Sequence, residues 1–245
     1  MPGDTRSADG TRRASPGRKA PAVGVVDRPA RLGALGVVAA IVAFSATFAI
    51  ALGVTGTAYV WHVNMISDLG DGLCRIRGGR WICSPGFAMF NTGMVVTGAL
   101  LTVGATCVSR LWGRLFGGSV VVMGVGLMIA GVFPAGDDGS VHLVGVVLAL
   151  VVPGLGLLVS AIPRQTAWLS SRRLTRGGLG AVALLFCAES RLPGTLLPRG
   201  AGELIIVGCL LLALFIEAVP VLLAPRAESK HQRRPAAEVS AGSTG

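Results

Sequence analysis

The chain has 245 residues, of which 52% are hydrophobic and 14% are charged, and its mean hydropathy is +0.69. Soluble domains carry about 25% charged residues, and a charge in hydrocarbon must be paired, hydrated or neutralised. The composition therefore indicates an integral membrane protein. The net charge of +10 does not indicate nucleic-acid binding, because only 5% of the residues are aromatic and no basic stripe is interleaved with side chains on which bases stack.

The first 31 residues are rich in Arg, Pro, Gly and Ser and have no apolar periodicity. Such a segment buries too little apolar surface to offset its chain entropy, so we expect residues 1–31 to form a disordered basic tail, and residues 225–245 a second one. The apolar run that begins at Leu32 is much longer than the core of about 7–15 residues in a cleaved signal peptide. We therefore expect this run to stay in the protein as an anchor.

Six apolar segments follow within residues 32–224, and a spanning helix needs about 20 such residues. The predicted spans are 32–60, 87–108, 115–133, 140–162, a fifth around 177–188, and 203–224. The fifth is the weakest, because its apolar core has only 12 residues, and a re-entrant segment is the alternative. The predicted fold is an all-α, polytopic membrane bundle of six transmembrane helices.

The basic residues predict the orientation of this bundle. With six spans, 17 Lys and Arg residues lie in the two tails and in the loops after the second and fourth spans. The opposite side holds five, namely Arg75, Arg77, Arg80, Arg191 and Arg199. Because Lys and Arg are enriched on the cytoplasmic side, both termini are predicted to be cytoplasmic. The excess of arginine over lysine, 20 to 2, is typical of a high-GC bacterial genome and so predicts a bacterial plasma membrane.

Proline and glycine inside the spans predict how the helices pack. Pro153 should kink the fourth span, because proline removes a backbone hydrogen bond. Glycines let helices approach closely in a membrane, and many lie within the predicted spans, among them Gly93, Gly98, Gly104, Gly117, Gly118, Gly124, Gly126, Gly131, Gly154 and Gly156.

Polar residues gather at the predicted outer ends of the helices and form a candidate binding cluster. Its members are Ser67, Asp68, Asn91, Asp137, Asp138, His142, Glu189 and Arg191. An ionisable residue inside a span is a functional candidate by default, and His142 is the only histidine placed in one. Partners for Glu189 and Arg191 stay open, with pairs Glu189–His142 and Arg191–Asp68 as hypotheses.

Each member of this cluster also has a purely structural interpretation. Asp138 and His142 share a helix face if the fourth span begins at Asp138, and such a pair can ligate a metal or move a proton. The alternative is that Asp138 only caps the helix and His142 bonds to a neighbouring helix. Asp68 can likewise be a cap, and Asn91 either binds a substrate or joins two helices. Glu217, deep in the last span, is either a protonated carboxyl bonded to another helix or part of a proton path.

Cys74 and Cys83 flank a basic turn in the first outer loop. An oxidising exterior permits a disulfide between them, which is the favoured interpretation. A zinc site is disfavoured, because zinc normally takes four N or S ligands with tighter spacing. The remaining cysteines, Cys107, Cys187 and Cys209, lie within or beside spans and are expected to be packing residues.

Several of these residues carry a family resemblance. The motif residues are Ser67, Asp68, Leu69 and Gly70 after the first span, Phe90 and Asn91 at the start of the second, Gly131, Val132, Phe133 and Pro134 at the end of the third, and then Asp137, Asp138 and His142. Over residues 32–224 the chain resembles the bacterial and archaeal membrane family catalogued as domain of unknown function 998. The layout is distantly similar to proteins of the Frag1 and DRAM type. The resemblance implies six helices and no assigned activity, and the chain departs from it by its long basic tail and by the insert at residues 74–83.

The sequence contains no phosphate-binding loop, nucleophile elbow, His-Glu-x-x-His or Cys-x-x-Cys motif, so no cofactor is predicted, and a metal stays open. The favoured function is a non-enzymatic membrane protein that binds, senses or moves a lipid or small solute through the outer cluster. The alternative is a metal-dependent hydrolase acting on a lipid, with Ser67, Asp68, Asp138 and His142 around a metal-bound water. A role as an assembly partner, and the oligomeric state, also stay open.

Overall fold

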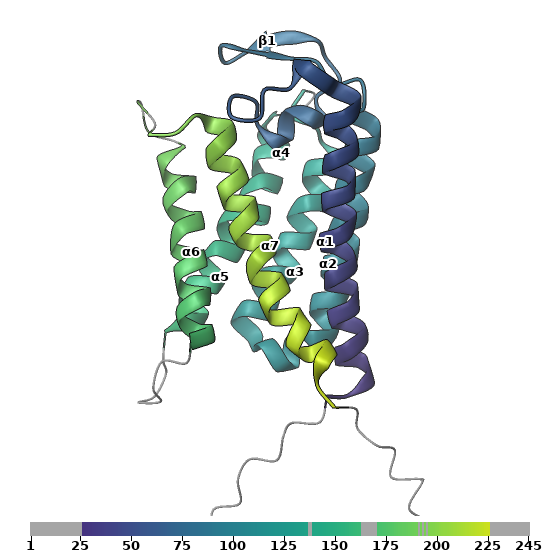
Figure 1. Ribbon diagram of the computed structural model, residues 1–245, viewed down its shortest axis with the longest axis vertical. Helices are drawn as coiled ribbons and strands as arrows, with labels where there is room; N and C mark the ends of the chain where they lie inside the picture. Colours follow the sequence, from purple (N-terminus) through teal and green to yellow (C-terminus); the bar gives the residue numbers. More distant parts are fainter. Residues whose placement is uncertain are drawn as a thin grey trace, which may run out of the picture.

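The computed structural model describes residues 26–136, 139–162, 171–190, 192, 194 and 196–225, and these form a bundle of long helices with one short hairpin (Figure 1). The helices are α1 (Arg28–Thr55), α2 (Phe87–Trp112), α3 (Arg114–Val132), α4 (Gly139–Val146), α5 (Val152–Ala161), α6 (Ser171–Glu189) and α7 (Arg199–Leu223). Between α1 and α2 lie the helical turns η1 (Gly56–Ala58) and η2 (Ile66–Gly70) and the strands β1 (Arg75–Arg77) and β2 (Arg80–Ile82). The predicted all-α membrane class is confirmed.

The two ends of the bundle differ in what they carry. The strands lie at one end, which we call the hairpin end, and the described chain begins and finishes at the opposite end, which we call the tail end (Figure 1). At the tail end the guanidinium of Arg31 donates a hydrogen bond to the carbonyl of Leu222. The start of α1 and the finish of α7 are therefore side by side.

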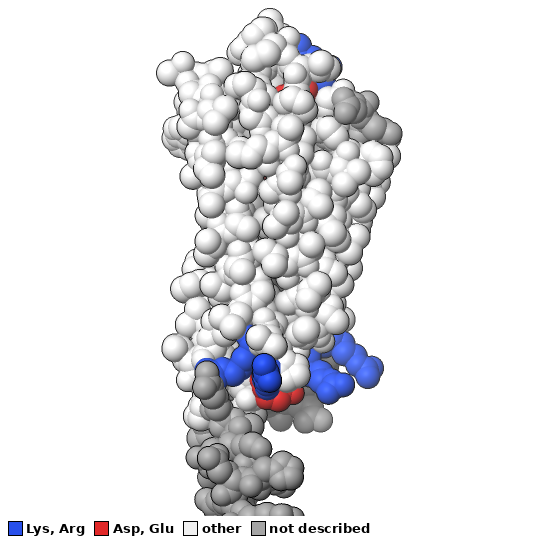
Figure 2. Space-filling model, turned by 90° about the vertical axis from the view of Figure 1, so that its right-hand side faces the viewer, with Lys and Arg blue, Asp and Glu red and all other residues white. Residues whose placement is uncertain are grey.

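Among the described residues, five helical segments are long and apolar enough to cross a membrane: Arg28–Ala58, Phe87–Trp112, Arg114–Val132, Gly139–Ala161 and Arg199–Leu223. Figure 2 shows an uncharged belt between the two ends, with Lys and Arg gathered at the tail end. Helix α6 is not one of the five, because Arg172, Arg173 and Arg176 stand in its first two turns. It packs against α5 and α7, and α7 crosses the bundle obliquely (Figure 1). The sixth crossing stays a prediction.

Helix α1 begins earlier and ends earlier than predicted. A side-chain oxygen of Asp27 accepts a hydrogen bond of 3.0 Å from the backbone N–H of Ala30, and Pro29 occupies the first turn, both of which are typical of a helix start. Arg28 and Arg31 therefore belong to the helix rather than to the tail. At the other end Gly56, with φ 58°, terminates it.

The fourth predicted span consists of α4, the π-helical turn η3 (Val147–Val151) and α5. Pro153 is the second residue of α5 and lacks the N–H that would bond the carbonyl four residues earlier. The kink stays a prediction, and the segment before Pro153 contains a π-helical turn, a feature that occurs frequently at functional sites. Ala149 in this turn is only 2% exposed.

Pairs of glycines hold successive helices together. A methyl group on Gly98 of α2 would come within 2.4 Å of the Gly124 carbonyl oxygen of α3, and one on Gly124 within 2.5 Å of the Gly98 oxygen. The same reciprocal contact joins α1 to α2 and α3 to α4, through the pairs Gly33–Gly104 and Gly126–Gly145. Between α5 and α6 the close approach is one-sided: a methyl group on Gly180 would come within 2.8 Å of the Gly154 oxygen. Close backbone approach of this kind is how helices associate in membranes.

A buried ion pair joins α6 to α7 near the tail end. The guanidinium of Arg176 donates to both carboxylate oxygens of Glu217, at 2.6 and 3.0 Å, and lies 5.2 Å from the ring centre of Phe116. The ion pair with Arg176 accounts for this geometry. It does not require Glu217 to be a protonated carboxyl or part of a proton path. Arg176 belongs to a helix, whereas the sequence placed it in a loop.

Candidate functional site

Asp68 lies in η2 and is held by an arginine from β2. The Arg80 guanidinium donates to both carboxylate oxygens of Asp68, at 2.6 and 2.8 Å, and the Asp68 side chain is 4% exposed. The backbone N–H of Met65 donates to the same carboxylate at 2.8 Å. The hydrogen bond with Asp68 raises the pKa of Arg80, opposed in part by its burial. Asp68 therefore caps η2, which is the structural interpretation left open by the sequence analysis. Arg80 compensates its charge.

Asp71, which is fully buried, connects the hairpin to the loop between α3 and α4. Its carboxylate lies 3.0 Å from Arg75 and 3.7 Å from Arg77. The same two guanidinium groups donate to backbone oxygens of that loop: Arg77 to Ala135 at 2.7 Å and Arg75 to Gly136 at 3.4 Å. The arginines of the hairpin therefore tie η2 and the α3–α4 loop into one cap over the bundle.

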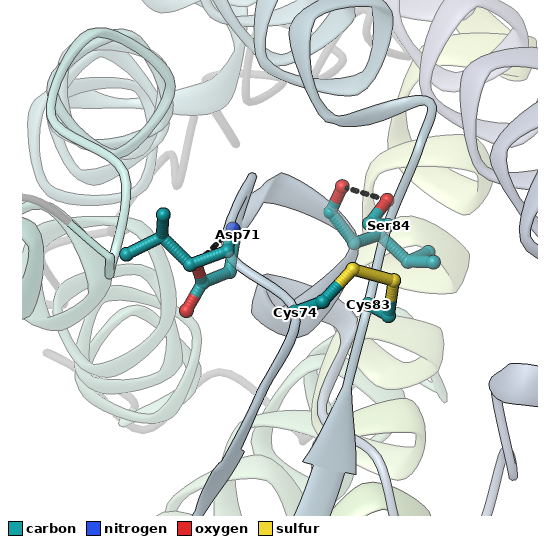
Figure 3. Close-up of a disulfide and its surroundings, with 6 residues drawn as sticks. Asp71, Cys74, Cys83 and Ser84 are labelled. Atoms are coloured by element: carbon teal, nitrogen blue, oxygen red, sulfur yellow. Dashed lines mark hydrogen bonds between the residues drawn. A yellow bond between two sulfur atoms is a disulfide. The ribbon is translucent and has the colours of Figure 1, made fainter.

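A disulfide closes the base of this hairpin. Cys74 and Cys83 are bonded to each other, and Ser84 donates a hydrogen bond of 2.7 Å to the carbonyl of Leu69 in η2 (Figure 3). Gly78 and Gly79 form the turn, both with positive φ as a tight hairpin turn requires. The insert at residues 74–83 thus carries the partners of Asp68 and Asp71.

Asn91 joins η2 to α2. Its side-chain amide donates a hydrogen bond of 3.0 Å to the carbonyl of Gly70, and a methyl group on Gly70 would come within 2.4 Å of the Asn91 side-chain oxygen. Only glycine fits this close approach. Asn91 therefore positions the loop, and part of its side chain also lines the cavity described below.

Glu203 anchors the same loop from α7. Its carboxylate accepts a hydrogen bond of 2.5 Å from the backbone N–H of Ile66, and the residue is 9% exposed. Burial, together with the negative charges of Glu203 and Asp68, raises the pKa of Tyr59, so this phenol is neutral. Close by, the Ala201 N–H donates to the carbonyl of His62 at 3.2 Å. The start of α7 is therefore docked onto the loop that follows α1.

Beneath this cap the helices enclose a cavity of about 60 Å³. Its wall is apolar and comes from α1, η2, α2, α3, the α4–η3 segment and α7, including Phe44, Leu101, Met123, Leu127, Ala149 and Leu210. A single water needs about 10–15 Å³ by the same measure, so the cavity has room for about four to six waters or as many methylene groups. Such a wall favours a hydrocarbon chain over water.

Two polar side-chain atoms in this wall have no hydrogen-bond partner among the described residues. Thr97 is 1% exposed, and its hydroxyl is unpartnered, whereas Thr92, Thr102 and Thr106 on the same helix each donate to the carbonyl four residues earlier. The second atom is Nε2 of His142, which is buried although the residue as a whole is only partly so. Buried polar groups are nearly always hydrogen-bonded, so both atoms are candidates for a hydrogen bond with a ligand.

The other ring nitrogen of His142 is occupied. Nδ1 lies 2.9 Å from the carbonyl oxygen of Phe133 and 3.3 Å from that of Ala130, at the end of α3. Carbonyl oxygens only accept, so Nδ1 carries a proton and donates. In the neutral ring Nε2 is then an acceptor.

A wider cleft of about 550 Å³ adjoins the cavity. It lies between the α4–η3 segment, the ends of α6 and α7, and the hairpin, and Asp68, Arg77, Arg80 and Arg199 line it. Cavity and cleft share part of their lining, namely Ser67, His142, Val146, Leu150 and Glu203. His142 and Glu203 therefore stand at the boundary between an apolar interior and a polar opening.

The structure brings together part of the predicted cluster. Ser67 and His142 line both spaces, Asp68 lines the cleft and Asn91 the cavity. Glu189 lies apart from the cavity, where its carboxylate accepts a hydrogen bond of 3.3 Å from the backbone N–H of Leu197. The remaining three, Asp137, Asp138 and Arg191, lie outside the described residues.

The metal-centred alternative finds little support in the described part of the chain. No group of three His, Cys, Asp or Glu side chains within it is arranged to hold a metal ion. Asp68 is paired with Arg80, and His142 is bonded through Nδ1 to backbone carbonyls.

Sequence analysis missed Glu203, Thr97, Asp71 and the role of Arg80. Glu203 had a signal, since it is an acidic residue one turn inside an apolar segment. Asp71 and Arg75 are four apart, a spacing suited to an ion pair. Thr97 had none, because a threonine in an apolar helix normally bonds its own backbone.

Five apolar helical segments and an apolar belt define the class: an integral membrane protein that crosses the bilayer several times. The chain matches the family described as "Protein of unknown function (DUF998)" over residues 37–220, which is 184 of its 245 residues, and it belongs to this family. The predicted family membership is confirmed. Neither a search of curated proteins nor one of solved structures found a match.

Proposed function

We propose that this protein is a membrane receptor or carrier that holds a lipid or a small apolar solute in the cavity beneath the hairpin cap. The observation that carries the proposal is the apolar cavity whose wall contains the unpartnered hydroxyl of Thr97 and the unpartnered Nε2 of His142. Ligand sites are typically apolar pockets with a few convergent polar groups. The adjoining cleft supplies a route from the cavity to the hairpin end.

We further propose that the chain crosses a bacterial plasma membrane six times, with both termini in the cytoplasm. The proposal is supported by the described chain, which begins and finishes at the tail end, as it would with an even number of crossings and α6 as the sixth. Among the described residues the tail end holds seven arginines, namely Arg28, Arg31, Arg110, Arg114, Arg172, Arg173 and Arg176, and the hairpin end holds four, namely Arg75, Arg77, Arg80 and Arg199. This excess supports a cytoplasmic tail end.

The proposed function is tested by filling the cavity. Ala130 of α3 lines it and is 6% exposed, whereas Val125 on the same helix is 37% exposed outside the bundle. Ala130→Leu places a leucine inside the cavity, and Val125→Leu places a leucine on the same helix outside it. Native mass spectrometry of detergent-purified protein should find a retained amphiphile on the wild type and on Val125→Leu.

The Ala130→Leu variant should lose that amphiphile while keeping its thermal unfolding midpoint within a few degrees of the wild type. Equal amounts of the same molecules on all three proteins would mean that they are surface lipids, and the proposal would be wrong. An Ala149→Leu variant, which fills the cavity from η3, repeats the test if Ala130→Leu does not fold.

A further inference from the structure

The hydrogen bonds that His142 can still form indicate which polar group a ligand in the cavity should carry. Nε2 of His142 has no partner among the described residues, and Nδ1 already donates to the backbone. In a ring whose Nδ1 carries the proton, Nε2 holds the lone pair, and this lone pair is available to whatever occupies the cavity.

Glu203 is the other titratable residue at this boundary. One of its side-chain oxygens already accepts a hydrogen bond from the backbone N–H of Ile66. Three arginines line the cleft and none of them lines the cavity. Arg80 is paired with Asp68, Arg77 lies 3.7 Å from Asp71, and Arg199 forms no ion pair with a described residue. An anionic headgroup at the boundary would face Glu203 without a free cation inside the cavity to compensate it.

We propose that the cavity ligand carries a neutral hydrogen-bond donor, a hydroxyl or an amide N–H, which donates to Nε2 of His142 while its hydrocarbon part fills the apolar wall. The proposal rests on the proposed function, and adds the headgroup class to it. The hydroxyl of Thr97, deeper in the same wall, is a second contact for a polar atom farther along the ligand. The site therefore discriminates alcohols and amides from fatty acids of the same chain length.

The test uses three probes of equal length: hexan-1-ol, hexane and hexanoate. The full-length protein in detergent carries ¹³C-methyl methionine and ¹⁵N-histidine. Met94 and Met123 line the cavity and report occupancy by any chain, while Met89 lines a groove on the outside and serves as a control. The Nε2 resonance of His142, assigned by its absence in His142→Gln, reports the hydrogen bond.

Hexan-1-ol should shift Met94, Met123 and His142 Nε2, and hexane should shift the two methionines alone. Relative to hexane, the variant His142→Phe should bind hexan-1-ol about fivefold more weakly than the wild type does, the loss expected for one net hydrogen bond. Thr97→Val, which has nearly the same shape, should lower the affinity for the alcohol relative to the affinity for hexane.

The outcomes separate the two proposals. If no probe shifts Met94 or Met123, the cavity is not a binding site and the proposed function is wrong. If hexan-1-ol shifts the methionines but leaves His142 Nε2 unchanged, the cavity binds chains and the headgroup inference is overturned. It is equally overturned if hexanoate binds more tightly than hexan-1-ol.

Discussion

At the scale of single residues, the pair Asp68–Arg80 is the strongest polar contact of the cap. Both side chains are largely buried, at 4% and 11% exposure. Removing one member of a buried pair leaves the other charge uncompensated and typically costs about 3–5 kcal/mol. We therefore expect Arg80→Gln to lower the free energy of unfolding by about 3 kcal/mol, measured by denaturant titration in detergent.

A double-mutant cycle gives the control for this prediction. The variant Asp68→Asn, Arg80→Gln removes both charges and should be less destabilised than the sum of the two single variants. Arg199→Gln is the matched control, because Arg199 is exposed, lies at the same end and forms no ion pair with a described residue. Additive effects of the two substitutions would show that the pair contributes nothing to stability.

The same residues show what a sequence can predict of such a site. Asp68, Asn91 and His142 were found because polar residues next to long apolar segments are conspicuous. Their partners were not found, because Arg80 and the carbonyls of Ala130 and Phe133 meet them only through the folded loops. An unpartnered atom such as the Thr97 hydroxyl is invisible in sequence, since it is defined by the absence of a contact.

At the scale of secondary-structure elements, glycine pairs determine how closely the helices pack. A methyl group on Gly124 would meet the Gly98 oxygen at 2.5 Å and the Thr102 hydroxyl at 2.4 Å. Gly124→Ala should therefore force α2 and α3 apart and cost about 1–3 kcal/mol of unfolding free energy. Gly118→Ala on the same helix enters open space and should be neutral or slightly stabilising. Equal thermal midpoints for the two variants would contradict this packing.

The hairpin is held as an element by its disulfide. We expect Cys74 and Cys83 to resist maleimide until reductant is added, in a protein whose other three cysteines are alanine. The control is Cys74→Ser, which frees Cys83 and should label without reductant. The bridge closes a short loop, and its loss typically costs about 2–4 kcal/mol. Full labelling of the two-cysteine protein without reductant would exclude the bridge.

Prediction from sequence was most successful for elements whose signal is local. Long apolar runs gave five of the helices, and Pro153 directed attention to the segment that contains η3. The start of α1 was placed too late, because two arginines at positions 28 and 31 masked a helix capped by Asp27. The hairpin was not predicted as strands, since segments of three residues have too little pattern to be recognised.

At the scale of the whole molecule, the position of α6 determines the topology. Its first turns carry three arginines at the tail end, and one of them, Arg176, reaches Glu217 of α7. A helix that was only re-entrant would return the chain to the tail end before α7, but Glu189 at its finish bonds to Leu197, just before α7 begins at the hairpin end. These contacts support the proposal that α6 is the sixth crossing.

Fusions of alkaline phosphatase, which is active only outside the cytoplasm, test this topology in a bacterial host. Fusions after Gly136 and after Gly194 should be active, and fusions after Gly113, Arg173 and Pro225 should be inactive, with a cytoplasm-active fluorescent protein giving the inverse pattern. If α6 does not cross, the fusions after Gly194 and Arg173 will report the same compartment. Helix α7 would then place Pro225 on the opposite side of the membrane from Arg28. The number of crossings would then be odd, and the two termini could not both be cytoplasmic.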